Sequence, residues 1–124
     1  MAQNNCCSGG NTILLACSGG SNVGQLTNEA AKKLDIEKAG RFFCLAGVGG
    51  HIPGITAAVS AADKVLAIDG CDVACAKKCL DAEGISDYEY IVLTDLGIEK
   101  NRDFCLAETD IERVAQVCRE KLGL

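Results

Sequence analysis

Cysteine is the residue type in this sequence whose number and spacing could carry chemistry. Nine cysteines occur among 124 residues, an odd number. The N-terminus has no basic region, and the apolar run that follows is too short for the core of a signal peptide. In a reducing compartment, thiols at this density indicate metal ligation or redox chemistry. The nine residues are Cys6, Cys7, Cys17, Cys44, Cys71, Cys75, Cys79, Cys105 and Cys118.

Three of these cysteines, Cys71, Cys75 and Cys79, recur at every fourth residue. This spacing places side chains on one face of a helix. We expect Cys71 at or just before the start of that helix, where backbone N–H groups and the helix dipole stabilise a thiolate. Cys75 would then lie one turn into the helix. Cys79 would lie a turn further along, and we interpret it as a packing residue.

The apolar runs of the chain predict the strands of a parallel sheet. Four runs have strand length, and none alternates cleanly between apolar and polar residues, which indicates burial on both faces. They are Thr12–Ala16, Phe42–Ala46, Lys64–Ile68 and Tyr90–Thr94. A helical pattern follows each run. The four patterns are Val23–Leu34 with Asn22 as its N-cap, a segment that begins near Pro53, Asp72–Ala82, and a segment from the capping box Thr109–Glu112 to about Leu122.

The alternation of runs and patterns predicts a single-domain α/β fold in the order β-α-β-α-β-α-β-α. We expect three layers, with a parallel sheet of about four strands and helices on both of its faces. Residues 12–124 would form this domain. Residues 1–11 are polar and rich in glycine, and would be a flexible lead-in. In such folds the ligand crevice lies beyond the carboxyl ends of the strands.

Cysteines occur at or near the carboxyl ends of three predicted strands. Cys17 follows the first strand, Cys44 lies within the second, and Cys71 follows the third. Together with Cys75, these residues could supply the four sulfurs that surround zinc at about 2.3 Å in a tetrathiolate site. Such a closed shell would serve a structural, storage or transfer role, and Cu(I) or As(III) would also suit it.

A thiol enzyme is an alternative function for the same residues. Cys71 or Cys17 would then be the nucleophile. Another cysteine at the strand ends would resolve the intermediate in a redox or sulfur-transfer reaction. A third alternative is an accessory protein that holds a protein partner, in which a metal site only braces the loops.

Several other residues have structural interpretations. Cys118 lies on the apolar face of the last predicted helix, and we expect it in the core. Asp69 could accept N–H groups from its own loop or orient a ligand. The charged segment Glu99–Asp103 is interpreted as a solvated surface loop. Cys6 and Cys7 are interpreted as exposed thiols, and Cys105 has no assigned role.

The overall charge narrows the range of partners. The formal net charge is −5, which disfavours nucleic acid and anionic membrane surfaces as partners. No apolar run approaches the ~20 residues that a membrane-spanning helix needs. With no signal peptide and no membrane span in view, the sequence predicts a cytoplasmic protein. Its cysteines predict a metal ion or metalloid as the partner.

Four motifs, in this order along the chain, resemble the DGC-domain family. They are CSGGSNVG from Cys17, CLAG from Cys44, DGCDVACAKK from Asp69 and TDLGIEK from Thr94, which ends at Lys100. Members of this family are small prokaryotic proteins described as zinc-binding because of four characteristic cysteines. The resemblance implies that Cys17, Cys44, Cys71 and Cys75 hold Zn²⁺, and it implies an auxiliary role for Cys79.

Overall fold

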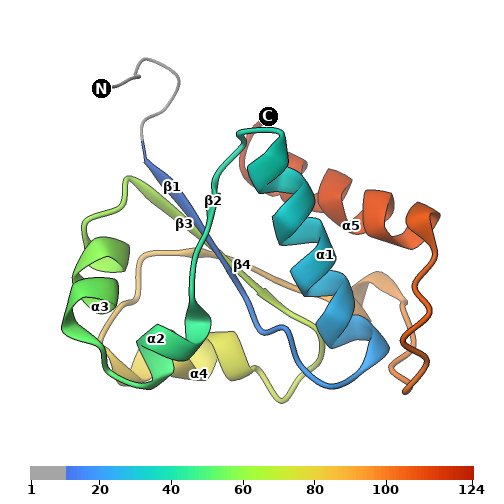
Figure 1. Ribbon diagram of the computed structural model, residues 1–124, viewed down its shortest axis with the longest axis horizontal. Helices are drawn as coiled ribbons and strands as arrows, with labels where there is room; N and C mark the ends of the chain where they lie inside the picture. Colours follow the sequence, from blue (N-terminus) through green and yellow to red (C-terminus); the bar gives the residue numbers. More distant parts are fainter. Residues whose placement is uncertain (1–10) are drawn as a thin grey trace.

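The computed structural model of the protein describes residues 11–124. All of the predicted lead-in except Asn11 therefore lies outside the described residues, as do Cys6 and Cys7. The described chain is one α/β domain (Figure 1). Its elements are β1 (Thr12–Ala16), α1 (Asn22–Ile36), β2 (Arg41–Phe42), α2 (Leu45–Gly49), α3 (Pro53–Ser60), β3 (Lys64–Asp69), α4 (Cys75–Ala82), β4 (Glu89–Val92), the 3-10 helix η2 (Leu93–Leu96) and α5 (Glu108–Lys121).

The four strands form one parallel sheet in the order β2-β1-β3-β4. Helices α1 and α5 cover one face, and α2, α3 and α4 cover the other (Figure 1). Within β1, Leu14 packs toward α1 and α5, whereas Ile13 and Leu15 pack toward the opposite layer. Helices on both faces bury four of the five side chains of β1, so the prediction of a three-layer fold from unbroken apolar runs is confirmed.

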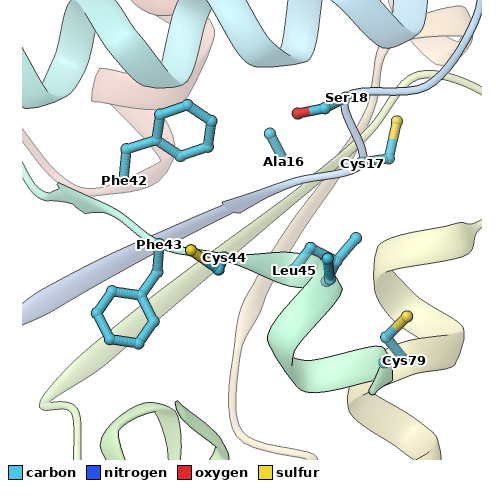
Figure 2. Close-up of a pocket in the computed structure, with 10 residues that line it drawn as sticks. Ala16, Cys17, Ser18, Phe42, Phe43, Cys44, Leu45 and Cys79 are labelled. Carbon is cyan, nitrogen blue, oxygen red and sulfur yellow. The ribbon is translucent and has the colours of Figure 1, made fainter. Parts of the chain in front are cut away.

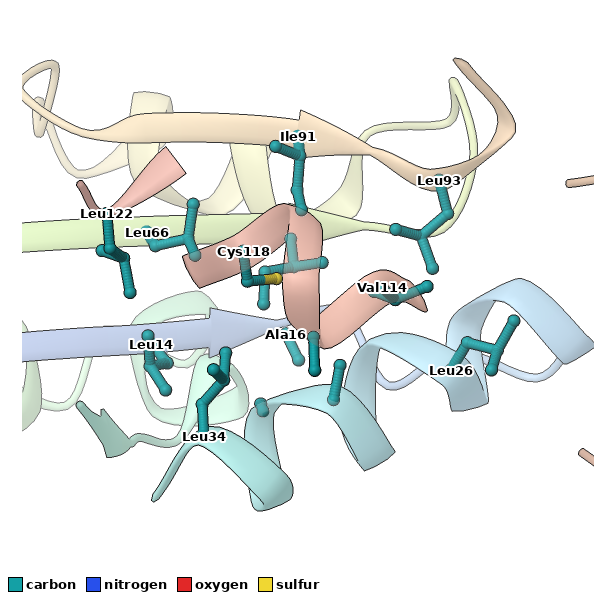
Figure 3. Close-up of a cluster of buried hydrophobic side chains, with 14 of the residues drawn as sticks. Leu14, Ala16, Leu26, Leu34, Leu66, Ile91, Leu93, Val114, Cys118 and Leu122 are labelled. Carbon is teal, nitrogen blue, oxygen red and sulfur yellow. The ribbon is translucent and has the colours of Figure 1, made fainter. Parts of the chain in front are cut away.

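The core between the sheet and helices α1 and α5 contains one of the cysteines. Cys118 of α5 is fully buried and packs with residues such as Leu14, Leu34 and Val114 (Figure 3). This confirms its predicted place in the core. Burial raises the pKa of the Cys118 thiol to about 12, because an apolar environment disfavours the thiolate.

The second strand is much shorter than its apolar run predicts. The expected strand Phe42–Ala46 is wrong: β2 ends at Phe42, and α2 begins at Leu45. Cys44 is the extended residue immediately before α2, with φ −96° and ψ 101°. Two residues of the run still pack inward without belonging to one strand: Phe42 contacts the α1/α5 core, and Leu45 contacts the opposite core. Short apolar runs of this kind do not distinguish a strand from a buried helix.

Three helix starts also differ from their predicted positions. The N-cap of α1 is Ser21 rather than Asn22, and its hydroxyl accepts a hydrogen bond of 3.0 Å from the Gly24 N–H. Helix α5 begins at Glu108, and its N-cap residue makes no side-chain capping hydrogen bond, so the predicted capping box does not form. Helix α4 begins at Cys75 rather than Asp72.

Two further details of the elements are relevant below. The backbone N–H of Phe42 in β2 donates a 2.7 Å hydrogen bond to the carboxylate of Asp35 in α1. The fourth strand ends at Val92, and the chain continues into η2 instead of completing the predicted strand Tyr90–Thr94. Within residues 11–124, none of the helices combines the length and apolar character needed to cross a membrane.

Candidate functional site

The loops that follow β1 and β3 meet at the carboxyl edge of the sheet. The chain runs from β1 outward to β2 through α1, and from β3 outward to β4 through α4 on the opposite face of the sheet. The boundary between β1 and β3 is therefore a topological switch point, where α/β folds bind ligands. A Cβ atom on Gly70 would lie 2.8 Å from the backbone nitrogen of Gly24, and one on Gly24 would lie 2.5 Å from the Gly19 oxygen. Only glycine permits so close an approach of two backbones, so these residues fix the geometry of the edge.

A pocket of about 600 Å³ at this edge is lined by three cysteines. Cys17 belongs to the loop after β1, Cys44 precedes α2, and Cys79 lies on α4. Figure 2 shows their side chains on separate segments around the start of α2. Cys17 and Cys79 are half-buried, and Cys44 is exposed. The other lining residues are largely apolar: Ala16, Ser18, Phe42, Phe43, Leu45, Ala46 and Gly49.

Cys79 has two roles in the structure. It packs against the core that includes Leu80 and Val48, as the sequence predicts, and it also lines the pocket. A Cβ atom on Gly49 would lie only 3.2 Å from the Cys79 sulfur, so the glycine leaves space for that thiol. Burial, with smaller contributions from Cys75 and Asp69, raises the pKa of the Cys79 thiol.

Cys71 and Cys75 do not line the pocket. The Cys71 sulfur accepts a 3.4 Å contact from the Lys100 ammonium, and the residue packs against the α1/α5 core. The expectation that Cys71 stands at the start of a helix is wrong, because that helix begins four residues later. Cys75 is the exposed first residue of α4. Of the four expected zinc ligands, the pocket therefore contains only Cys17 and Cys44.

The residues as arranged do not fit a closed four-cysteine zinc shell. Within residues 11–124, no three His, Cys, Asp or Glu side chains are grouped closely enough to hold a metal ion. The sulfurs of a tetrathiolate site converge to about 2.3 Å from a common centre. His51, the one histidine of the sequence, is exposed, and its Nδ1 is hydrogen-bonded to the Glu83 carboxyl group.

Asp69 anchors the helix that carries Cys75 and Cys79. Its carboxylate is almost completely buried and accepts hydrogen bonds from the backbone N–H groups of Ala76, at 2.8 Å, and Lys77, at 3.1 Å. It also accepts a 2.7 Å hydrogen bond from the Tyr90 hydroxyl. Burial and this bond to the carboxylate raise the pKa of Tyr90. A carboxylate at a helix N-terminus satisfies free N–H groups and complements the helix dipole, so Asp69 fixes the start of α4.

The segment Glu99–Asp103 is an exposed surface loop, as predicted, and it is also hydrogen-bonded to the start of α1. The buried side chain of Asn22 donates to the Glu99 oxygen at 2.8 Å and accepts from the Asn101 N–H at 2.6 Å. Arg102 donates to the Gly20 oxygen at 3.2 Å. These bonds bring Lys100 to Cys71. They join residues about 80 positions apart, which sequence spacing does not reveal.

Two residues beside candidate cysteines adopt the left-handed conformation. Ser18 has φ 52° and follows Cys17, and Ala74 has φ 61° and precedes Cys75. Non-glycine residues rarely adopt this conformation, and such strain is concentrated at functional sites. The N–H of Ser18 donates to the Thr27 hydroxyl at 3.1 Å, which holds the turn after Cys17 in place.

Comparisons with known proteins identify the family. The sequence profile of the DGC domain matches residues 13–118. The chain is similar to the "Anaerobic and virulence modulator AnvM" of Pseudomonas aeruginosa, with 34% identity over 102 residues, which are 82% of this chain and 78% of that protein. No solved structure matches the chain significantly. The match to most of the chain, with the motifs at the carboxyl edge, means that this protein belongs to the DGC-domain family.

Proposed function

We propose that this protein binds a soft metal ion or metalloid through the thiols of the pocket at the carboxyl edge of the sheet. One observation carries the proposal: Cys17, Cys44 and Cys79 come from three separate segments and line the same pocket. Thiolate sulfur is the ligand that soft ions prefer, and zinc accepts the same donor. The protein would act in the handling of such an ion, or as an accessory to proteins that do so.

The pocket differs from the closed zinc shell that the sequence suggests. Its thiols are spread around a cavity, so an ion would have to draw them together by rotation of the side chains. Cys44 is free to do so, because it is exposed and makes no side-chain capping hydrogen bond at α2. Zinc remains the first ion to test, and Cu(I) and As(III) follow from the all-sulfur character of the site.

The test is metal analysis of reduced protein prepared without oxygen, with a count of titratable thiols before and after chelation. We expect about one zinc per chain and thiols that react only after the metal is removed. Cys44→Ser should lower the metal content. Cys105→Ser, at an exposed position outside the pocket, is the control. Failure of the reduced wild-type protein to bind zinc, cadmium or trivalent arsenic would contradict the proposal.

A thiol-based redox or sulfur-transfer function is the second candidate, and the contact between Lys100 and Cys71 favours it. A cationic neighbour is characteristic of cysteines that act as nucleophiles. Cys71 would be the nucleophile in this case, with Cys17 as the alternative. The contact places an ammonium 3.4 Å from the Cys71 sulfur.

Alkylation rates test this second function. In the reduced protein, the Cys71 thiolate should displace iodide from iodoacetamide faster than the exposed Cys105 does. Lys100→Met should slow the labelling of Cys71, and Lys78→Met, at an exposed position of α4, should not. Equal rates at Cys71 and Cys105 in the wild-type protein would exclude an activated Cys71.

The cytoplasm is the compartment that we propose for this protein. Both candidate functions need reduced thiols, and the cytoplasm keeps thiols reduced. Alkylation of intact cells before lysis would record the state of the pocket cysteines. Cys17, Cys44 and Cys79 should be recovered alkylated, and recovery of these residues as stable disulfides would contradict the assignment.

A further inference from the structure

The surface loop 99–103 meets the turn after β3 through a contact between two side chains. The Lys100 Nζ atom lies 3.4 Å from the Cys71 Sγ atom. Among the ion pairs formed within residues 11–124, none includes Lys100, so its ammonium is directed at the sulfur and not at a carboxylate. Cys71 is half-buried and Lys100 is exposed, so small molecules dissolved in water can reach both atoms.

The first turn of α1 holds both partners of this contact. The residues on either side of Lys100 are hydrogen-bonded to the buried side chain of Asn22, at 2.8 Å and 2.6 Å. Gly70, immediately before Cys71, packs its backbone on the same turn, because a Cβ atom there would lie 2.8 Å from the Gly24 nitrogen. Since one helix turn fixes both backbones, the fold itself keeps the nitrogen and the sulfur together.

We propose that Cys71 and Lys100 form a modification site, at which dioxygen joins the sulfur to the nitrogen through one oxygen atom. Oxidised cysteine sulfur bonds to nearby thiols and nitrogen atoms. The bridge uses an oxygen atom to span the gap, so the two side chains need to move less from their 3.4 Å contact than a direct S–N bond would require. This inference does not depend on ion binding, because neither residue lines the pocket.

The reaction is balanced with dioxygen as the oxidant. The Lys100 ammonium first releases a proton to water. The S–H bond, one N–H bond and the O–O bond then break, and the S–O and O–N bonds form. The second oxygen atom leaves as water with the thiol proton and the amine proton. Sulfur and nitrogen each lose two electrons, and dioxygen gains four. Two molecules of a dithiol reverse the change and restore the thiol, the amine and a further water.

The bridge would act as a reversible switch on Cys71. It removes the free thiol and the lysine charge together, and it ties the loop 99–103 to the turn after β3. Any reaction in which the Cys71 thiol is the nucleophile would therefore stop in the oxidised protein and resume after reduction.

Peptide mapping of air-exposed protein tests the proposal. Reduced full-length protein is freed of reductant and kept in air-saturated buffer. Digestion without reductant should yield the Cys71 and Lys100 peptides joined, at about 14 Da above their summed mass, which is one oxygen atom less two hydrogen atoms. Dithiothreitol should release both peptides unmodified. Cys71→Ser and Lys100→Arg should lose this product, whereas the controls Cys105→Ser and Lys78→Arg, at exposed positions, should keep it.

The mapping is needed because a sulfenic acid and a disulfide within one molecule give the same total mass as the bridge. Oxygen on Cys71 without a link, a disulfide from Cys71 to another cysteine, or unchanged peptides would overturn the proposal. So would the same product from Lys100→Arg, which keeps the positive charge at an exposed position and does not depend on how Cys71→Ser folds. Soft-ion binding is measured separately on the pocket thiols, so its failure would leave this result unchanged.

Discussion

The α1/α5 core and the carboxyl edge of the sheet both contain cysteine, yet they are built in opposite ways. In the core, Cys118 is fully buried among aliphatic side chains such as Leu14 and Leu34. At the edge, Cys17 and Cys44 are half-buried and exposed, beside glycines and a left-handed turn. The difference teaches that packing in the core closes a thiol off from solvent, whereas loops from different strands leave thiols accessible at the edge.

The two regions also depend on different forces. The core is held by contact between apolar side chains, so its stability follows volume and polarity. The edge is held by close contact between backbones at Gly24 and Gly70 and by the buried carboxylate of Asp69. We therefore expect substitutions at the edge to act through the backbone, and substitutions in the core to act through packing.

The largest effect should come from Gly70→Ala. Its Cβ would lie 2.8 Å from the Gly24 nitrogen, and two backbones cannot separate without moving both loops. We expect a loss of about 3 kcal/mol or more in the free energy of unfolding, measured by urea denaturation. Gly54→Ala is the matched control, because a Cβ there meets no atom within 4 Å. If both variants are equally stable, close backbone contact does not hold the edge.

Asp69→Ala should be the next most damaging change. It leaves the N–H groups of Ala76 and Lys77 and the hydroxyl of Tyr90 without their acceptor. Loss of a buried, charged acceptor costs about 2–4 kcal/mol. Hydrogen exchange at the amides of Ala76 and Lys77 should accelerate more than exchange in α1. The exposed Asp87→Ala is the control, and unchanged exchange at α4 would show that Asp69 does not fix the helix start.

Cys118→Ser tests the core by replacing the buried thiol with a hydroxyl group of similar size. The serine hydroxyl would be buried among aliphatic groups, and a buried polar group without a partner costs about 1–3 kcal/mol. Chemical denaturation should show this loss, whereas Cys105→Ser should stay near wild type. A stable Cys118→Ser protein would mean that this part of the core admits water.

Alkaline pH should also report on the burial of the Cys118 thiol, through a smaller change in the free energy of unfolding. The folded pKa of Cys118, about 12, lies above the unfolded value of a thiol. Its contribution to stability is thus complete below the unfolded pKa and is lost as the pH rises toward the folded one. Between about pH 9 and pH 10 the wild type should lose about 1 kcal/mol more than Cys118→Ala. Parallel pH profiles of the two proteins would contradict the buried thiol.

Cys44→Ser should have the smallest effect on folding. The side chain is exposed and makes no side-chain capping hydrogen bond at α2, so the free energy of unfolding should change by less than about 0.5 kcal/mol. This variant distinguishes the edge from the core most clearly, because it should impair soft-ion binding and leave the stability almost unchanged. A large loss of stability would place Cys44 with Cys118 as a structural residue.

The sequence predicts the interior of the sheet better than its edge. The strand Thr12–Ala16 and the buried position of Cys118 follow from apolar patterns, which depend only on neighbouring residues. The short β2 and the late start of α4 depend on packing and on the bonds of Asp69, which a pattern does not contain. The spacing of Cys75 and Cys79 places both on one helix face, but the direction of that face follows from where the helix begins.

The brevity of β2 has a consequence for contact between copies of the protein. The two outer strands of a sheet expose unpaired backbone groups, which can recruit strands from other molecules. Here β2 has two residues and β4 has four. The N–H of Phe42 is already bonded to the carboxylate of Asp35. The apolar strands β1 and β3 lie inside the sheet, so the protein presents short outer strands, one of them capped by a carboxylate, that disfavour edge-to-edge aggregation.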